Sequence, residues 1–242
     1  MNIVVVVPTY NEAGNIAALA DALLALPLAG LRLLVVDDDS PDGTGRLAEE
    51  LAAARPGRVD VLHRPAPRGF GLAYKDGFRW ALDHGAEAIV QMDADLSHDP
   101  AVVPRLVEKL AEFDVAVGSR YVAGGRVDEE WGPARFALSR SANLLARAIL
   151  GLGIHDTTSG FKAWRRTALE AIDLGRVRSG GFLFLEEMAY LCRRLGLRVC
   201  EVPIYFAERR VGLSKMSLKV KLEAAAGLFA LRRHHRKVRP LS

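Results

Sequence analysis

The feature that most constrains this chain is the alternation, through residues 1–120, of short apolar runs with segments of helical periodicity. Residues 3–7 (IVVVV) form a continuous β-branched run, which is typical of a strand buried on both faces of a parallel sheet. Residues 11–26 then repeat apolar side chains at helical spacing, with Asn11 as the expected N-cap. Strands that alternate with helices in this way predict an α/β fold with a doubly wound, mostly parallel sheet flanked by helices.

Five strands and four helices are expected in the first half of the chain. The strands are predicted at residues 3–7, 31–36, 58–63, 86–92 and 114–119, and the helices at 11–26, 42–54, 69–85 and 101–113. The pattern then loosens, because residues 121–136 are polar and contain glycine, which favours a loop. The later predicted elements are a helix at 139–153, a strand within 159–166, a helix at 182–196, a strand pair at 197–208 and a helix at 214–238. No linker interrupts these elements, so a single domain is expected.

Length and composition agree with a globular chain of this kind. The sequence has 242 residues, 50% of them hydrophobic and 26% charged, which is enough to bury a core. No apolar stretch approaches the roughly 20 residues that cross a bilayer, so no transmembrane helix is expected. Residues 1–10 lack the charged leader of a signal peptide. Cys192 and Cys200 have no CxxC spacing, so two reduced thiols and a cytoplasmic location are expected.

The net charge of +4 is unevenly distributed, because residues 209–242 carry ten Lys or Arg and one acid, a net +9, which leaves −5 on the rest. One helical stripe in this tail is apolar and consists of Leu218, Leu222, Ala225 and Phe229. A basic amphipathic helix is typical of a membrane surface, although a helix packed on the domain with a solvated basic end also fits. Aromatic residues are not interleaved with the cations after Phe229, so no nucleic-acid partner is expected.

Four polar clusters follow predicted strands. They are residues 8–12 (PTYNE), 37–44 (DDDSPDGT), 93–98 (DADLSH) and 118–121 (GSRY). Any one of them could be a simple turn, but open α/β sheets bind ligands at the carboxyl ends of their strands, so four clusters there predict a ligand site. The three adjacent aspartates of the second cluster repel one another unless a cation or several hydrogen-bond donors compensate.

Asp93 and Asp95 stand one residue apart directly after an apolar run, and the pair could bind a metal, act as acid and base, or start a turn. Carboxylate ligands suit Mg²⁺ or Mn²⁺ better than zinc, and such ions commonly bridge a protein carboxylate to a diphosphate. The chain has no GxGxxG and no GxxxxGK[ST], which disfavours a dinucleotide site and a P-loop.

The ordered set of four clusters resembles glycosyltransferase family 2, whose members have the GT-A fold. Four further motifs resemble the polyprenyl-phosphate (dolichyl-phosphate) mannose synthases within it, namely RGFGLAYKDGF, SGFKAW, FLFLEEM and RRVGLSKM. The resemblance covers residues 1–216 and implies that they form a GT-A catalytic domain. Residues 217–242 are then expected to be a basic amphipathic C-terminal helix and tail.

The resemblance implies which residues bind the donor. The side chains expected to line the nucleotide and diphosphate site are Pro8, Tyr10, Glu12, Asp38 and Asp93. Asp93 and Asp95 would form the DxD-like pair that binds Mg²⁺ or Mn²⁺. Some relatives carry a glutamine two residues after the second aspartate, whereas this chain has Ser97, a shorter ligand that water or His98 could supplement.

The resemblance also implies the acceptor and closing residues. Arg120, Arg135 and Ser139 would face the phosphate of a lipid acceptor, because arginine grips phosphate with a bidentate fork. Arg209 and Lys215 would close over the donor phosphates. The expected catalytic residues are Asp95, Arg120, Arg135, Arg209 and Lys215. The alternative for Arg135 is a surface ion pair with an acid of residues 127–131. Glu187, the acid of the EM pair, is left without an assigned role.

The implied reaction transfers mannose from GDP-mannose to a polyprenyl monophosphate, with inversion, giving a β-linked mannose. The protein would then bind the cytoplasmic face of a membrane peripherally, and a separate membrane-spanning protein is a conceivable partner. Three alternatives stay open: a UDP-glucose-dependent glucosyltransferase that acts on the same lipid, a non-catalytic protein that binds nucleotide sugars, and a phospho-acceptor signalling domain. The last is disfavoured because its acidic pair follows the first strand, whereas here the aspartate triplet follows the second.

Overall fold

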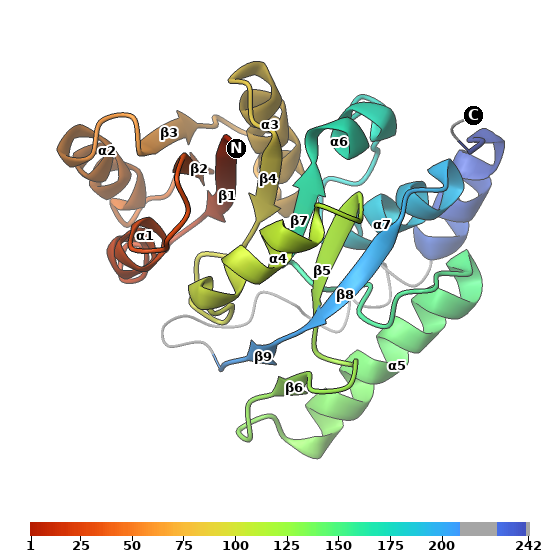
Figure 1. Cartoon of the computed structure of the whole chain (residues 1–242). Helices are drawn as coiled ribbons and strands as arrows, with labels where there is room; N and C mark the ends of the chain where they lie inside the picture. Colours follow the sequence, from red (N-terminus) through yellow and green to blue (C-terminus); the bar gives the residue numbers. More distant parts are fainter. Residues whose placement is uncertain (209–226, 241–242) are drawn as a thin grey trace.

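The computed structural model describes residues 1–208 and 227–240, and a seven-stranded sheet forms its centre (Figure 1). Its strands are β1 (Ile3–Thr9), β2 (Leu31–Asp37), β3 (Val59–His63), β4 (Ala88–Gln91), β5 (Val115–Ser119), β7 (Lys162–Arg165) and β8 (Val199–Pro203). Their order is β3-β2-β1-β4-β7-β5-β8, and every pair is parallel except the two that β7 makes. The predicted mostly parallel α/β sheet is therefore confirmed.

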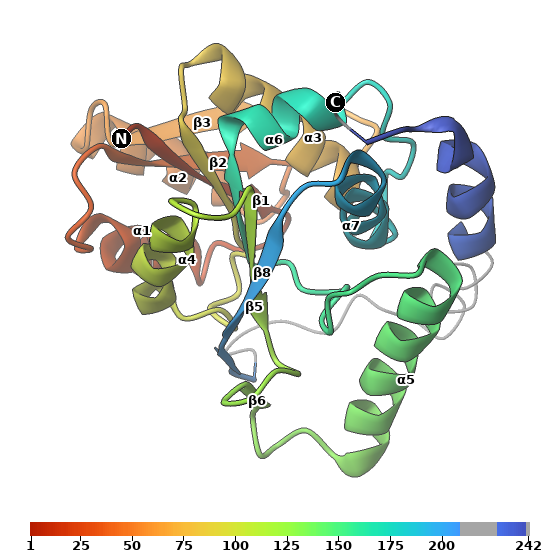
Figure 2. The ribbon, with the colours of Figure 1, turned by 45° about the vertical axis from the view of Figure 1, so that its right-hand side comes forward.

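Helices cover both faces of this sheet, as Figure 2 shows. One face carries α1 (Ile16–Leu24), α2 (Thr44–Ala54), the short η1 (Pro100–Val102) and α4 (Val103–Lys109); the other carries α3 (Phe70–Asp83), α6 (Arg166–Ile172) and α7 (Phe184–Leu195). Successive residues of a strand point to opposite faces, so Val5 packs in the first layer and Val6 in the second. This explains why β1 is apolar at every position rather than at alternate ones.

Helix α3 packs closely on the sheet at Gly77. A Cβ atom on Gly77 would lie 2.4 Å from Val6 Cγ1, so a larger residue would push the helix away from β1. The backbone amide of Gly69, at the N-terminal end of α3, donates to Asp38 after β2. The close packing at Gly77 and the hydrogen bond from Gly69 together hold the start of α3 beside the carboxyl edge of the sheet.

Two local predictions are wrong. The first helix begins at Ile16 with Asn15 at the cap position, while Asn11 adopts a left-handed φ of 60° within the preceding turn. Residues 121–136 are also not a simple loop. Arg126–Val127 forms β6, which pairs with β9 (Tyr205–Phe206), and α5 (Pro133–Leu150) begins six residues before the predicted start at 139. Pro133 suits the first turn of a helix, where its missing N–H is not needed.

The described end of the chain packs on the domain. Residues 227–234 are helical, and Leu228 and Leu231 are buried in a small apolar cluster with side chains of α5 and α7. Phe229 of the predicted stripe is 63% exposed. The other stripe residues and the proposed boundary at 216/217 lie outside the described residues. Within 1–208 and 227–240, no helix is long and apolar enough to cross a membrane.

Candidate active site

The carboxyl ends of β1, β2, β4 and β5 lie at one edge of the sheet, and a predicted polar cluster follows each of them. Strand β1 pairs in parallel with both β2 and β4, and β5 lies beyond the antiparallel β7. The register sets Thr9 beside Asp37, which brings the first two clusters into contact. The prediction that these clusters share one sheet edge is confirmed.

Hydrogen-bond donors surround the carboxylates of the 37–44 cluster. Asp37 accepts from Thr9 Oγ1 at 3.0 Å and from Ser40 Oγ at 2.6 Å. Asp42 accepts from both the backbone N–H, at 3.0 Å, and the hydroxyl, at 2.6 Å, of Thr44. Burial raises the pKa of Asp42, but these hydrogen bonds outweigh burial and leave the pKa below its usual value. Local donors thus provide part of the compensation that this acidic run requires.

Asp38 is the acid of this triplet that was predicted to bind the donor, and its side chain is buried. It is 6% exposed, accepts a hydrogen bond from Gly69 N at 2.9 Å, and pairs with the guanidinium of Arg64. Arg64 also donates from Nε to Asp76 Oδ2 of α3 at 2.7 Å. Asp38 therefore joins the ends of β2 and β3 to the start of α3, and its contact with the donor nucleotide stays a prediction.

Arg68 forms hydrogen bonds with residues of both the first and the second polar cluster. Its Nε donates to the Asp38 carbonyl at 2.9 Å, its Nη1 donates to Tyr10 Oη at 3.1 Å, and its Nη2 donates to Asp39 Oδ2 at 3.0 Å. The guanidinium also lies 4.7 Å from the centre of the Tyr10 ring. This contact fixes the tyrosine that was predicted to line the nucleotide pocket.

Sequence reasoning missed Arg64 and Arg68. Both belong to residues 63–69 (HRPAPRG), which follow β3 at the same sheet edge and therefore formed a fifth candidate cluster. The sequence analysis did not single out this cluster. Its two cations neutralise much of the charge of the aspartate triplet.

Pro8 and Glu12 flank Tyr10 at the end of β1. Pro8 is a half-buried residue of the strand itself. The backbone N–H of Glu12 donates to Thr44 Oγ1 at 2.9 Å, and its carboxylate accepts from Asn15 Nδ2 at 2.8 Å. These contacts hold the two loops together, while the donor-binding roles of Pro8, Tyr10 and Glu12 remain predictions.

Asp93 lies just after β4, is half-buried, and lies close to α3 and to Gly160. It accepts from Tyr74 Oη of α3 at 3.0 Å, and its backbone N–H donates to His98 Nδ1 at 3.4 Å. A Cβ atom on Gly160 would lie 2.9 Å from its Oδ2, so the backbone there approaches the carboxylate closely. Burial and the charge of Asp93 raise the pKa of Tyr74 well above its usual value, so the phenol stays a donor. Burial also lowers the pKa of His98, which leaves a neutral imidazole.

Asp95 is 4% exposed, and the residues after it hold its carboxylate in place. Its Oδ1 accepts from the Ser97 hydroxyl at 2.5 Å and from the Ser97 backbone N–H at 3.1 Å. Leu96 between them has a left-handed φ of 60°, a conformation that is uncommon and costly for a leucine. Across residues 1–208 and 227–240, no group of three or more His, Cys, Asp or Glu side chains is arranged to hold a metal.

Arg120, directly after β5, makes a bidentate ion pair with Asp156. Its Nε and Nη2 donate to the two carboxylate oxygens at 2.7 and 2.6 Å, and its backbone N–H donates to the same group at 3.0 Å. The two side chains are 8% and 0% exposed. Burial lowers the pKa of Arg120, but Asp156 outweighs burial and raises the pKa overall. The guanidinium is therefore firmly oriented, and its contact with an acceptor phosphate stays a prediction.

Arg135 and Ser139 lie near Arg120 on the first turns of α5. Tyr121 Oη donates to Ser139 Oγ at 2.7 Å, which links α5 to the end of β5. Arg135 lies 4.1 Å from the ring of Trp131 and pairs with Glu208, rather than with an acid of residues 127–131. The three predicted acceptor residues thus belong to one region of the structure. Arg209 and Lys215 lie outside the described residues.

Sequence reasoning missed the polar residues that support this region. Asn143 of α5 accepts from Thr157 N at 2.7 Å and donates to Thr158 Oγ1 at 3.1 Å, and Glu201 of β8 accepts from Asp156 N at 3.0 Å. The only signal in the sequence was the polar run HDTTSG at 155–160. A polar run of this kind does not reveal which distant arginine it binds.

Comparisons with known proteins agree with this geometry. The model of the family described as glycosyl transferase family 2 matches residues 4–173. Polyprenol monophosphomannose synthase of Mycolicibacterium smegmatis is 48% identical over 215 residues, which cover 88% of this chain and 80% of that protein. Undecaprenyl-phosphate mannosyltransferase of Micrococcus luteus is 43% identical over 229 residues, covering 94% and 93%.

A solved structure has the same fold at low sequence identity. Glucosyl-3-phosphoglycerate synthase from Mycobacterium tuberculosis, crystallised with Mn²⁺, uridine diphosphate and glucosyl-3-phosphoglycerate, superposes with a TM-score of 0.68 at 21% identity. The match covers 100% of this chain and 81% of that one. The fold, the order of its polar clusters and the identity to the two mannosyltransferases agree: the chain belongs to glycosyl transferase family 2 and is a glycosyltransferase with the GT-A fold.

Proposed function

We propose that this protein transfers mannose from GDP-mannose to a polyprenyl monophosphate and forms a polyprenyl-phosphate β-mannose. The observation that carries the proposal is sequence identity to two proteins whose names specify mannose transfer to a polyprenol phosphate. The chain is 48% identical to the first and 43% identical to the second, over most of its length. The arginine-containing region around Arg120 and Arg135, beside the start of α5, supports the phosphate part of this proposal.

The donor site is proposed to lie over the ends of β1, β2 and β4. Pro8, Tyr10, Glu12 and Asp38 would contact the nucleoside, with Arg68 holding the tyrosine ring in position. The donor carries a diphosphate, and the arginines near the aspartate triplet make this edge less repulsive to it than the acids alone would.

Asp93 and Asp95 fit a divalent cation of the Mg²⁺ or Mn²⁺ type. Both offer hard carboxylate oxygens, and Gly160 keeps the space beside Asp93 clear of a side chain. Mg²⁺ is usually bound by one or two carboxylates together with substrate phosphates and water, so two aspartates are a sufficient protein contribution. The bound cation would supply neutralisation of the charge that develops on the leaving diphosphate. The Mn²⁺ in the crystallised glucosyl-3-phosphoglycerate synthase is consistent with this proposal.

The acceptor phosphate would contact Arg120, Arg135 and Ser139. A phosphate monoester has a second pKa near 6, so it is already largely dianionic at neutral pH and needs no strong base. The side chains must therefore bind and aim the nucleophile rather than deprotonate it. Asp156 is proposed to keep the Arg120 guanidinium in one orientation for this purpose, as a positioning residue.

A single in-line displacement at the anomeric carbon, with inversion, would then complete the reaction. The acceptor oxygen forms the new bond as the nucleoside diphosphate leaves with the electron pair of the broken bond. Arg209 and Lys215 are proposed to stabilise the departing diphosphate, a kind of contact worth roughly 10²–10³-fold in rate per well-placed donor.

A lipid acceptor requires contact with a membrane surface, and α5 offers an apolar face for it. Leu138, Leu144 and Leu145 of this helix are 43%, 64% and 43% exposed, and Figure 2 shows α5 at the margin of the molecule beside the C-terminal helix. Leu144→Asp should therefore weaken sedimentation with anionic vesicles, whereas Ala53→Asp on the distant α2 should not. Equal sedimentation of both variants and the wild type would exclude this face.

The acceptor assignment is tested by offering GDP-mannose and Mg²⁺ with two lipids in detergent, a polyprenyl phosphate and the corresponding polyprenol. The proposal predicts a mannolipid from the phosphate alone, because the polyprenol lacks both the dianionic nucleophile and the ligand for the arginines. Equal transfer to the polyprenol would contradict it. Intact binding of GDP-mannose without any product would instead point to a different acceptor or to a missing partner.

A further inference from the structure

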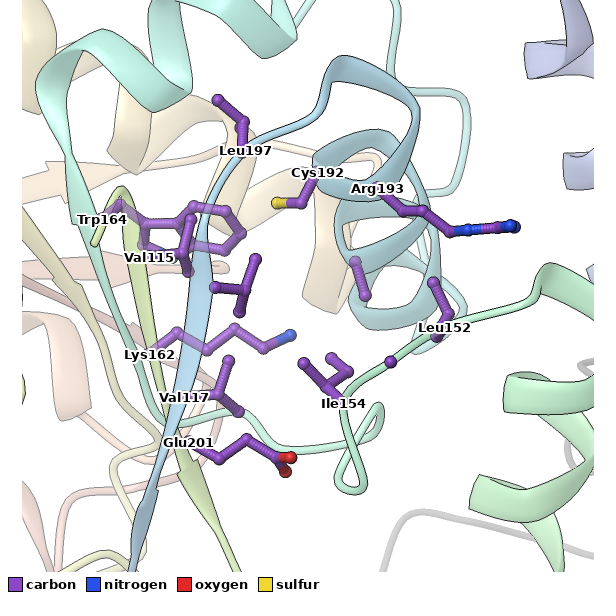
Figure 3. A pocket seen from close by; sticks show the side chains of 13 residues that line it. Val115, Val117, Leu152, Ile154, Lys162, Trp164, Cys192, Arg193, Leu197 and Glu201 are labelled. Atoms are coloured by element: carbon purple, nitrogen blue, oxygen red, sulfur yellow. The ribbon is translucent and has the colours of Figure 1, made fainter. Parts of the chain in front are cut away.

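A cavity of about 360 Å³ lies between the sheet and α7. Its walls come from one face of β5, β7 and β8, from α7, and from the loop at residues 152–154 (Figure 3). Most of the lining is apolar and includes Val115, Val117, Leu152, Ile154 and Trp164. The cavity is within the size range of small-molecule sites. None of the predicted donor, metal or acceptor residues lines it.

One cation projects into this apolar space. Lys162 begins β7, is 1% exposed, and in Figure 3 its side chain extends from the strand into the cavity. Among the described residues, its one hydrogen bond is a long contact of 3.4 Å from Nζ to the Leu185 carbonyl, and no carboxylate forms an ion pair with it. An ammonium group carries three N–H donors, so most of this donor capacity is unused. Burial lowers the pKa of Lys162 to about 8, although nearby acidic groups, Glu186 among them, act to raise it, and the side chain is still mainly protonated at neutral pH.

A second buried donor lies two residues along the same strand. Trp164 is 1% exposed, lines the cavity, and its Nε1 has no hydrogen-bond partner among the described residues. Residues two apart in a strand point to the same face, so Lys162 and Trp164 share this wall. Buried polar groups normally have partners, and two donors without adequate acceptors beside one cavity indicate that an acceptor can enter it.

The other charged groups of the lining are already engaged. Glu201 accepts hydrogen bonds from the backbone N–H groups of His155 and Asp156, at 2.8 and 3.0 Å. Arg193 donates from Nη1 to the Leu150 carbonyl at 2.5 Å and is exposed, so water is available to its remaining N–H groups. Lys162 is therefore the buried cation of the lining whose unused donors have no access to solvent.

We propose that this cavity binds a small amphiphilic carboxylate, with the carboxylate on Lys162 and the hydrocarbon body against the valine, leucine and isoleucine side chains. A carboxylate has a single negative charge, which one ammonium matches, and only acceptor atoms, which suit the unused donors of Lys162 and Trp164. A phosphate dianion would leave one charge buried without compensation, and a neutral apolar molecule would leave Lys162 unsatisfied. The proposal concerns a site separate from the reaction and does not depend on the mannose assignment.

The test titrates the intact protein with octanoate and with 1-octanol, measuring affinity by calorimetry and location by the methyl NMR signals of Val117 and Ile154. The two probes have the same chain length and differ in their head group. We expect saturable 1:1 octanoate binding that shifts both methyl signals, and roughly 10- to 100-fold weaker binding of octanol, the usual worth of a charge-assisted hydrogen bond. Equal affinities, or no binding of octanoate, would overturn the proposal on the wild-type protein alone.

Two variants assign the effect to one residue. Lys162→Met removes the buried charge but keeps an unbranched side chain, and it should bind octanoate no better than octanol while melting at an equal or higher temperature. Lys109→Met makes the same charge change at an exposed site on α4, on the opposite face of the sheet, and should bind octanoate as the wild type does. Wild-type affinity for octanoate in folded Lys162→Met, or a matching loss in Lys109→Met, would refute the role of Lys162.

Discussion

The carboxylate of Glu187 accepts a hydrogen bond of 2.6 Å from His235 Nε2 in a site where the two side chains are 0% and 1% exposed. Glu187 also accepts from the backbone N–H groups of Arg178 and Ser179, at 2.9 and 2.7 Å. It therefore joins α7, the loop at residues 178–181 and the described end of the chain, whose short η2 (His235–Lys237) supplies the histidine. The acid of the EM pair thus has a structural position, which the sequence did not reveal.

His235→Ala should destabilise the protein by roughly 1–3 kcal/mol, because it leaves a buried charged acceptor with one donor fewer. Urea denaturation of the wild type and the variant measures this difference. The neighbouring His234 is exposed, and its hydrogen bond with Arg178 is long, at 3.3 Å, so His234→Ala should change stability by less than about 0.5 kcal/mol. Equal effects at the two positions would show that the buried contact contributes nothing.

Glu187 should also make stability depend on pH in the acid range. Burial raises its pKa, but the hydrogen bonds from His235, Arg178 and Ser179 outweigh burial and hold the pKa below its usual value. A carboxyl group with a lowered folded pKa stabilises the protein above the unfolded value of about 4.3, and this contribution disappears as the pH falls through the folded pKa. The stability difference between the wild type and Glu187→Gln should therefore be largest near pH 7 and shrink below about pH 4. A constant difference across this range would contradict the assignment.

Asp156→Asn should be more damaging than a comparable change at the surface. The variant leaves the buried Arg120 without its bidentate partner, and breaking a buried pair in this way costs roughly 3–5 kcal/mol. The matched control is Glu50→Gln, which removes the exposed i,i+4 pair between Arg46 and Glu50 and should cost at most about 0.5 kcal/mol. Thermal and urea unfolding compare the two. Similar losses in both variants would show that burial of the Arg120–Asp156 pair does not matter.

Asp95→Asn should lower kcat by roughly 10²–10³-fold while the protein remains folded, because it removes a charged ligand from the proposed metal and diphosphate site. Chelation of divalent ions should abolish transfer by the wild type, and added Mg²⁺ or Mn²⁺ should restore it. The control is Asp99→Asn a few residues further on, where the side chain caps η1 by accepting from Ala101 N at 2.9 Å and asparagine can do the same. Wild-type turnover in a folded, metal-replete Asp95→Asn protein would refute the proposed metal role.

The strands of the sheet could be predicted from the sequence because each is marked by a short-range pattern. Apolar runs such as residues 3–7 can only be buried on both faces, and polar residues directly after them must lie at the carboxyl edge. The start of α5 was missed because residues 121–136 are polar and contain glycine, a composition that favours a loop.

Long-range partners could not be predicted in this way. Arg120 and Asp156 are 36 residues apart, and His235 and Glu187 are 48 apart, so no local spacing connects them. Each pair is made by the fold, through the antiparallel β7 in one case and the packing of the chain end on α7 in the other. Lys162 illustrates the same limit, since only the structure shows that its charge is buried beside a cavity.

The most direct test of the central claim is a competition between GDP-mannose and UDP-glucose for one polyprenyl phosphate, with the purified protein and Mg²⁺ or Mn²⁺. Mass spectrometry identifies the sugar on the lipid, and NMR of the anomeric carbon identifies the linkage. The account predicts a single product, a β-linked mannosyl phosphate lipid that comes from GDP-mannose. A glucosyl lipid made from UDP-glucose in its place, or an α-linked mannose, would contradict it.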